Sequence, residues 1–201
     1  MSDVRGVILA TGSKTRRAMF AAAGLAVEAV RPPVDEEALK DSLIAEGASP
    51  RDIADALAEL KAVAVSARYP GALVIGGDQV LVLGDRIISK ALDRRDAVAK
   101  LKALSGNRHE LLSAVVVALD GQPIWRHVDK ARLDMRPLSD VFIEDYLDQM
   151  GDVAFESAGA YQLEGLGAQL FTRVEGDYFT VLGLPLLPLL DLLRRYGQVP
   201  L

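Results

Sequence analysis

The sequence of 201 residues predicts a mixed α/β fold, in which helices cover a central twisted sheet. Short apolar runs of strand length alternate with amphipathic segments of helix length. The two longest strand candidates, 109–119 and 123–135, are joined by Asp120-Gly121-Gln122, which favours an antiparallel hairpin. We therefore expect a mixed sheet within one domain spanning residues 1–201, because a purely parallel sheet contains no such hairpin.

The first half of the chain contains clear start and stop signals. Gly24 is placed to end the first helix, and Ser49 with Pro50 supplies a cap and a first helical position for a later one. In order, the expected elements are a strand at 4–10, a helix at 14–23, a strand at 27–30, an acidic loop at 35–37 and a helix from 50 to about 68.

In the second half, Gly76-Gly77-Asp78 is interpreted as a break between two apolar runs. Ser139 is the expected cap of an amphipathic helix that Gly151 ends. The further elements expected are strands at 73–76, 79–83, 86–89 and 169–174, helices at 93–104 and from 185 to about 196, and a glycine-rich loop at 157–167.

The composition excludes several classes of function. The chain has no cysteine, so it has no disulfide, thiolate zinc site or thiol nucleophile, and it carries no recognisable signal peptide, so we expect a cytoplasmic protein. A net charge of −5 argues against long nucleic acid as a partner, and no apolar run is long enough for a membrane span. His109 and His127 match no metal spacing, so carboxylates would hold any metal.

The junction of the first strand and helix, Ser13-Lys14-Thr15-Arg16-Arg17, resembles an anion site. Helix N-terminal N–H groups, the positive end of the helix dipole and two guanidinium groups would meet there. The alternative is that Ser13 only caps the helix and that the arginines are solvated. The segment lacks the glycine pattern of a P-loop.

Five further residues are candidates for chemistry. Asp78 could be a general base or a metal ligand, or simply a turn aspartate, and Glu36 a second ligand or part of a solvated loop. Lys61 and Lys90 could bind a buried anion or extend to water. Glu164 could accept hydrogen bonds from a nucleobase edge or point outward. No Ser/His/Asp triad is credible. Cations for phosphates, carboxylates for a divalent cation or a water, and a glycine-rich loop for a flat base together suggest a nucleotide hydrolase.

The whole chain resembles the Maf family, also named after inhibition of septum formation. The similarity covers nearly the full length and rests on blocks in the same order as in that family. They are Leu9-Ala10-Thr11-Gly12-Ser13-x-x-Arg16-Arg17, Val34-Asp35-Glu36, Leu57-Ala58-x-x-Lys61-Ala62, Ile75-Gly76-Gly77-Asp78-Gln79-Val80, Ser89-Lys90, Leu104-Ser105-Gly106-x-x-His109-Glu110, Arg136-Pro137-Leu138-Ser139, Ala158-Gly159-Ala160-Tyr161-x-x-Glu164-Gly165-x-Gly167, and Glu175-Gly176-Asp177-Tyr178 through Val181-x-Gly183-Leu184-Pro185-Leu186.

The resemblance implies a nucleoside triphosphate pyrophosphatase that splits the α–β phosphoanhydride with Mg²⁺ or Mn²⁺. It implies an architecture like that of inosine triphosphate pyrophosphatases, with two lobes around a cleft, and a homodimer. Asp78 would be the proton acceptor and, with Glu36, would hold the metal. The residues implied to hold the triphosphate are Ser13, Arg16, Lys61 and Lys90.

The resemblance also bears on the choice of nucleotide, through Thr15, Gln79 and Glu164. In the family that the chain resembles, the dTTP/UTP branch has Arg, Thr and Gln at these positions, and the 7-methyl-GTP branch has Trp, Gln and Glu. The chain agrees with the second branch at two positions, but it lacks the tryptophan, which would stack on a cationic base. A purine-type, 7-methyl-GTP-like triphosphate is therefore expected. The alternatives are dTTP or UTP, or a nucleotide-binding regulator of cell division with little catalysis.

Overall fold

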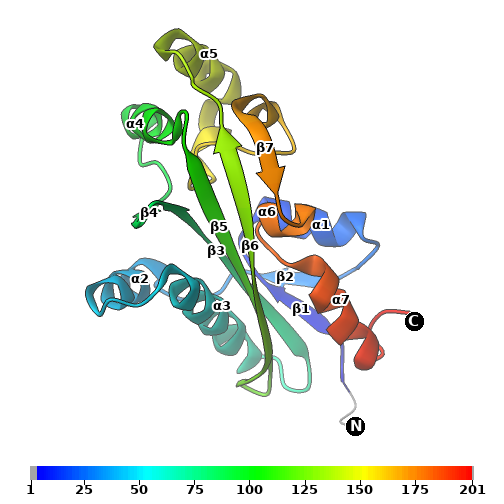
Figure 1. The fold of residues 1–201 in the computed structure, drawn as a ribbon. Coiled ribbons are helices and arrows are strands. Elements are labelled where there is room, and N and C mark those ends of the chain that lie inside the picture. The colour runs from blue at the N-terminus through cyan, green and yellow to red at the C-terminus, as the bar shows by residue number, and fades with distance from the viewer. Residues whose placement is uncertain (1–3, 201) are drawn as a thin grey trace. The chain divides into compact units, whose positions relative to one another are not determined.

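The computed structural model describes residues 4–200, and these residues form the mixed sheet that the sequence predicts (Figure 1). Its order is β2-β1-β3-β5-β6-β7, with β4 paired to β3. β1 is parallel to β2 and β3, whereas β4 is antiparallel to β3 and β7 to β6. The strands are β1 (Val7–Ala10), β2 (Glu28–Val30), β3 (Leu73–Leu83), β4 (Arg86–Ile88), β5 (Arg108–Leu119), β6 (Gln122–Met135) and β7 (Phe171–Glu175).

Helices occupy most of the remaining chain. The α-helices are α1 (Lys14–Ala22), α2 (Glu36–Ala45), α3 (Pro50–Ser66), α4 (Arg94–Leu104), α5 (Asp140–Met150), α6 (Tyr178–Val181) and α7 (Leu186–Arg195), and the 3₁₀ helices are η1 (Gly151–Phe155) and η2 (Leu166–Leu170). Within residues 4–200, no helix is long and apolar enough to cross a membrane.

The chain divides into two compact units, which are described separately. The first comprises residues 1–79, 113–129 and 178–201, and the second comprises 80–112 and 130–177.

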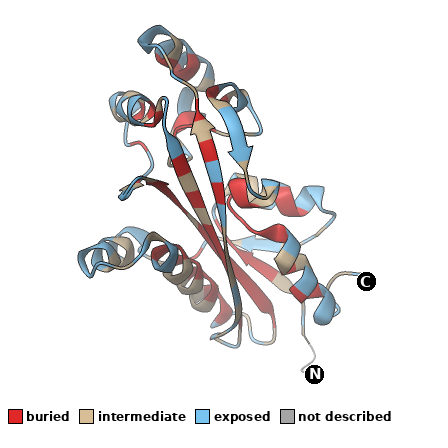
Figure 2. Ribbon diagram, in the orientation of Figure 1, coloured by how far each residue is buried: buried red, intermediate tan, exposed pale blue. Residues whose placement is uncertain are grey.

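The first unit has three layers, because alternate residues of its strands point to opposite sides of the sheet. On one side, α1 and α7 pack on β1, β3 and β5 through a buried cluster of Leu9, Met19, Phe20, Leu73, Ile75, Val115, Val117, Leu184, Leu186, Leu189, Leu192 and Leu193. On the other side, α3 joins a cluster of Ile8, Ala10, Val65, Ala72 and Val74. Figure 2 shows the consequence, since β1, β3 and β5 are mostly buried and α1, α3 and α7 are buried along one side only.

The second unit contains α4 and α5, which contact each other. The side chain of Ser139 accepts a hydrogen bond from the first turn of α5, as the sequence predicts, and Asp93, expected within the helix at 93–104, instead caps α4 in the same way. The helices contribute apolar side chains to the core of this unit: Ala97, Leu101, Leu104, Ile143, Tyr146 and Leu147.

The break expected at Gly76-Gly77-Asp78 is wrong, because β3 runs without interruption through all three residues. The glycines permit close packing on both faces of the strand. A β-carbon on Gly76 would lie 2.2 Å from the carbonyl oxygen of Ala58 in α3, and one on Gly77 would lie 2.6 Å from Leu184 Cδ1. Asp78 is therefore a residue of the strand interior, 9% exposed, and not an exposed strand end.

The acidic loop expected at 35–37 is also wrong. Asp35 caps α2 by accepting a hydrogen bond from the N–H of Ala38, and Glu36 and Glu37 form the first turn. Carboxylates are favoured there by the positive end of the helix dipole. Helix α6 was not expected, because it is a single turn without a cap in the sequence.

Candidate active site

The first strand ends where the N-terminus of α1 begins, and this junction carries the first group of candidate residues. Ala10, the last residue of β1, pairs with Gly76, so β3 continues beyond β1 by way of Asp78. Ser13 Oγ accepts a hydrogen bond from the N–H of Arg16, which confirms its interpretation as a helix cap. A capping hydroxyl can still donate its own proton, so the cap does not exclude a phosphate contact.

Lys61 of α3 lies between two carboxylates. Its Nζ is 2.6 Å from Asp78 Oδ1 and 2.7 Å from Glu36 Oε2, and Lys61 is 5% exposed. The packing of Gly76 against α3 explains the first contact, because Asp78 is two residues further along and points to the same face of β3. Lys61 is therefore buried and ion-paired, and the alternative of a side chain that extends to water is wrong for this residue.

Arg16 lies half-buried on the first turn of α1. Its Nε donates to the carbonyl oxygen of Gly183 at 2.8 Å, and this nitrogen would lie 3.4 Å from a β-carbon on Gly77. Desolvation lowers the pKa of Arg16 below its ordinary value, while the charges of Asp78 and Glu36 act in the opposite direction. The Arg16 side chain is thus positioned by backbone and lies within the field of both candidate metal ligands.

Gln79 points to the opposite face of β3 from Asp78, as strand alternation requires. Its Nε2 donates to the carbonyl oxygens of Thr180 and Val181 at 3.0 and 3.1 Å, and to Ser113 Oγ at 2.8 Å. Ser113 in turn donates to the carbonyl of Thr180 at 2.7 Å. Neither Ser113 nor Thr180 was a candidate from the sequence.

Lys90 and Glu164 belong to the second unit, and both are exposed there. The Lys90 carbonyl accepts a hydrogen bond from Lys100 Nζ. The glycine-rich loop that carries Glu164 is held by Tyr161, whose backbone bonds twice to Ser157 Oγ and whose hydroxyl lies 2.7 Å from Nε2 of buried His109.

Thr15, the third candidate for nucleotide choice, is half-buried in the first turn of α1, next to Arg16. The first unit therefore brings Ser13, Thr15 and Arg16 together on one helix start and Glu36, Lys61 and Asp78 together in one ion-paired group.

The carboxylates suit a divalent cation in part. Among residues 4–200, no group of three or more His, Cys, Asp or Glu side chains could hold a metal ion. However, Glu36 and Asp78 both approach the single positive charge of Lys61, and Mg²⁺ commonly uses one or two protein carboxylates together with substrate phosphates and water. The donor set fits a cation that binds together with its substrate.

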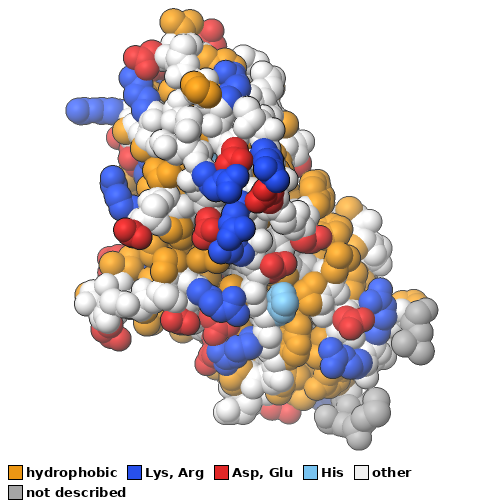
Figure 3. Space-filling model, in the orientation of Figure 1, with side chains coloured by type: hydrophobic (Ala, Val, Ile, Leu, Met, Phe, Trp, Pro, Cys, Tyr) orange, Lys and Arg blue, Asp and Glu red, His pale blue; other side chains and the backbone are white. Residues whose placement is uncertain are grey.

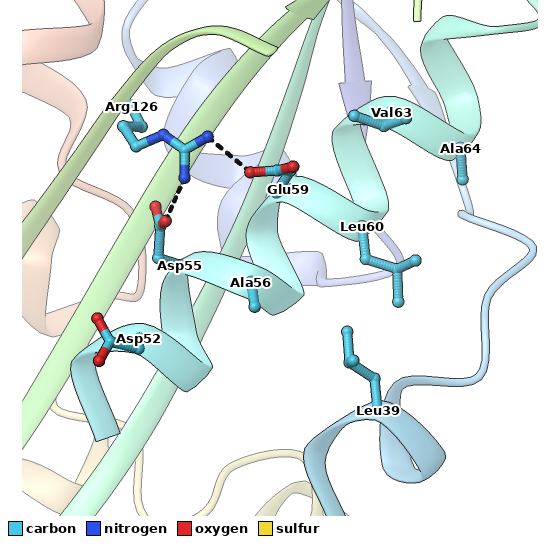
Figure 4. A pocket seen from close by; sticks show the side chains of 9 residues that line it. All are labelled: Leu39, Asp52, Asp55, Ala56, Glu59, Leu60, Val63, Ala64 and Arg126. Atoms are coloured by element: carbon cyan, nitrogen blue, oxygen red, sulfur yellow. Dashed lines mark hydrogen bonds and ion pairs between the residues drawn. The ribbon is translucent and has the colours of Figure 1, made fainter. Parts of the chain in front are cut away.

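A separate hollow lies between α2 and α3 and contains none of the candidate residues (Figure 4). Its floor is mostly apolar, and at its edge Arg126 of β6 forms ion pairs with Asp55 and with Glu59 at 2.6 Å.

Paired charges recur elsewhere, since Lys130 and Arg132 both contact Glu110. Figure 3 accordingly shows basic and acidic side chains interspersed on the face in view.

A helix start with cationic side chains, together with two carboxylates paired to a buried lysine in the same unit, defines the class as a mixed α/β protein with a site suited to phosphate groups. Comparison with known proteins identifies the family. The model described as Maf-like protein matches residues 6–196. The chain therefore belongs to the Maf family, which confirms the resemblance found in the sequence.

Several relatives align over 96% of this chain. A protein from Hyphomonas neptunium named nucleoside triphosphate pyrophosphatase is 55% identical, and the alignment covers 98% of its length. One of the same name from Caulobacter vibrioides is 54% identical over 96% of its length. A protein from Rhizobium meliloti named 7-methyl-GTP pyrophosphatase is 51% identical over 97% of its length.

Proposed function

We propose that this chain is a nucleoside triphosphate pyrophosphatase, a hydrolase that releases a nucleoside monophosphate and inorganic pyrophosphate. The observation that carries this proposal is the ion-paired group of Lys61, Asp78 and Glu36 beside Arg16, in a chain about half identical to relatives of that name. A triphosphate carries several negative charges, which must be neutralised before water can attack phosphorus. The basic side chains and the start of α1 supply that neutralisation.

Each residue has a role in this reaction. Asp78 accepts the proton of the attacking water as the new oxygen–phosphorus bond forms and the α–β anhydride bond breaks. Arg16, Lys61 and the start of α1 with Ser13 bind phosphate oxygens, and Lys90 of the second unit adds a further cation. Glu36 and Asp78 would hold Mg²⁺ or Mn²⁺, which would offset phosphate charge and make the bound water more acidic.

The nucleotide we propose is a 7-methyl-GTP-like purine triphosphate. Support comes from Gln79 and Glu164, and from relatives named 7-methyl-GTP pyrophosphatase at 51% and 50% identity. Glu164 is exposed and can accept hydrogen bonds from a guanine edge. Thr15 offers no aromatic platform, so dTTP or UTP remains the second candidate. We also propose that the protein is cytoplasmic and forms a homodimer. Sedimentation analysis of the purified protein tests the dimer.

The experiment is an assay of wild-type protein and Asp78→Asn with 7-methyl-GTP, GTP, dTTP and UTP in Mg²⁺ or Mn²⁺. Asparagine keeps an oxygen that can accept from Lys61, so the variant should fold and bind nucleotide but lose turnover. Monophosphate and pyrophosphate as the products of wild type alone would support the proposal. Release of inorganic phosphate, or equal turnover by Asp78→Asn, would refute it, and no turnover by wild type would favour a binding regulator.

A further inference from the structure

Three acceptors around Gln79 Nε2, which share its two protons, fix which end of the side-chain amide faces the protein. Two of the partners are the backbone carbonyls of Thr180 and Val181, and a carbonyl oxygen can only accept. The amide nitrogen must therefore be the end that faces them. The reverse orientation would place the Gln79 oxygen against two other acceptors.

Ser113 strengthens this orientation. It is fully buried, and its Oγ donates its proton to the Thr180 carbonyl while accepting from Gln79 Nε2. The Thr180 carbonyl oxygen thus accepts hydrogen bonds from both the Ser113 hydroxyl and the Gln79 amide, and so fixes the orientation of the hydroxyl. Thr180 is also fully buried, and its own Oγ1 lies 3.1 Å from Asp129 Oδ2, so the segment that provides the carbonyls is held in place.

The oxygen of Gln79 is left on the side of Arg16. A β-carbon on Gly183 would stand 3.7 Å from Gln79 Oε1 and 3.4 Å from the terminal NH2 nitrogen of Arg16. Gly183 has φ +98, a conformation that favours glycine, and its carbonyl receives Arg16 Nε. The same short backbone segment therefore positions both an acceptor, Gln79 Oε1, and a donor, the Arg16 guanidinium.

We propose that Ser113 and the Thr180 and Val181 carbonyls orient Gln79 so that its amide oxygen meets the substrate, which makes this position select a hydrogen-bond donor of the nucleoside. The oxygens of a triphosphate at neutral pH are acceptors and would be repelled by Gln79 Oε1, whereas the Arg16 guanidinium attracts them. Gln79 thus reads an N–H, NH₂ or O–H group of the base or ribose. Ser113 is a positioning residue that acts through Gln79. This inference rests on the proposed function.

The test compares nucleotides that differ by one donor. GTP is paired with inosine triphosphate, 1-methyl-GTP and dGTP, and UTP with 3-methyl-UTP, while 7-deaza-GTP removes an acceptor instead. Loss of the donor that Gln79 reads should raise KM of the wild type about tenfold. In Gln79→Ala that penalty should disappear, and the effect of 7-deaza-GTP should be the same in both proteins.

Ser113→Ala should raise KM for the nucleotide with the donor about tenfold, leave KM for its donor-deleted analogue within about twofold, and change kcat less. Ser113→Thr, which keeps the hydroxyl, should restore the difference. Ser66→Ala is the matched control, because Ser66 is another buried serine of the same unit, bonded to the N–H of Gly121 and not to Gln79.

Equal effects of Ser113→Ala on both nucleotides, as a purely structural role would give, would overturn the inference. The inference would also be overturned if Gln79→Ala removed the KM penalty of a nucleotide that lacks an acceptor and not that of a nucleotide that lacks a donor. If wild type hydrolyses none of these nucleotides, the proposed function fails, and the same comparison is made on their dissociation constants by calorimetry. A third outcome is that wild type hydrolyses the nucleotides, but loss of a donor raises no KM that Gln79→Ala would restore. That outcome leaves the proposed pyrophosphatase activity standing and refutes this inference alone.

Discussion

The Nζ of Lys61 lies 2.6 Å from Oδ1 of Asp78, and the side chains involved are 6% and 13% exposed. Two charges with so little exposure to solvent stabilise each other, because either one alone would lose its hydration on burial without gaining a charged partner. The second carboxylate on Lys61, from Glu36, is 47% exposed and contributes less for that reason. The pair places a buried positive charge of α3 against the residue expected to activate water.

Replacing Lys61 with methionine should destabilise the fold by about 3 kcal/mol, because Asp78 would remain as a buried charge without a partner. Urea denaturation measures this loss. Lys102→Met is the control, since Lys102 pairs with Asp140 in an exposed position and its loss should cost less than about 1 kcal/mol. Equal losses in the two variants would contradict the importance of the buried pair.

Gly76→Ala should separate α3 from β3. A β-carbon at this position would lie 2.2 Å from the carbonyl oxygen of Ala58 and 2.6 Å from the N–H nitrogen of Ala62, and backbone cannot move aside as a flexible side chain can. We expect a loss of about 3 kcal/mol in the free energy of unfolding, together with lower activity because Lys61 moves with α3.

Gly12→Ala is the stability control for that change. The nearest atoms to a β-carbon there belong to the Arg31 side chain, at 3.8 Å. Its free energy of unfolding should stay within about 0.5 kcal/mol of the wild type. A similar loss in both variants would contradict the close approach of α3 as the reason for Gly76, because Gly→Ala by itself lowers the entropy of the unfolded chain and does not destabilise the fold.

Local signals made much of the fold predictable. Ser49 and Ser139 each cap the helix expected after them, and Asp120 and Gly121 both have positive φ in the hairpin turn. These features depend on neighbours in the sequence, so a single sequence contains them.

The errors share a different cause. Gly76 and Gly77 mark a strand break in many sequences, but here they allow α3 and Leu184 to approach β3, and those contacts are not visible locally. Ser113 meets Gln79 across 34 residues and Thr180 meets it across 101, so no spacing rule identifies them. Asp78 could be selected by resemblance, whereas its ion pair with Lys61 required the structure.

Arg16→Lys should weaken the site although it keeps the positive charge. Arg16 donates to Gly183 through Nε and still offers its terminal nitrogens to a phosphate, and a lysine ammonium cannot do both in that geometry. We expect kcat/KM for nucleoside triphosphates to fall about tenfold or more. Arg195→Lys, in the exposed last turn of α7, should leave kcat/KM unchanged, and an equal fall there would contradict a specific role of the Arg16 guanidinium.

Acid should destabilise the protein through His109. Burial lowers the pKa of His109 from 6.5 to about 4, although the charge of Asp134 opposes this shift. The ring is 1% exposed, it packs against Tyr161 and Phe171, and among residues 4–200 its Nδ1 is buried without a hydrogen-bond partner. A proton on His109 would therefore put a charge into an apolar environment.

Between pH 6.5 and 4 the unfolded chain binds a proton at His109 and the folded chain does not, so stability should fall by about 3 kcal/mol as the pH drops through this window and should be fully present above it. Urea denaturation from pH 4.5 to 7.5 measures the slope. His109→Gln, which cannot titrate, should give a flatter slope, and an unchanged slope would exclude His109 as the source. Proton NMR of the wild type gives a second readout, because a His109 pKa near 6.5 would show that the ring is not desolvated as its packing requires.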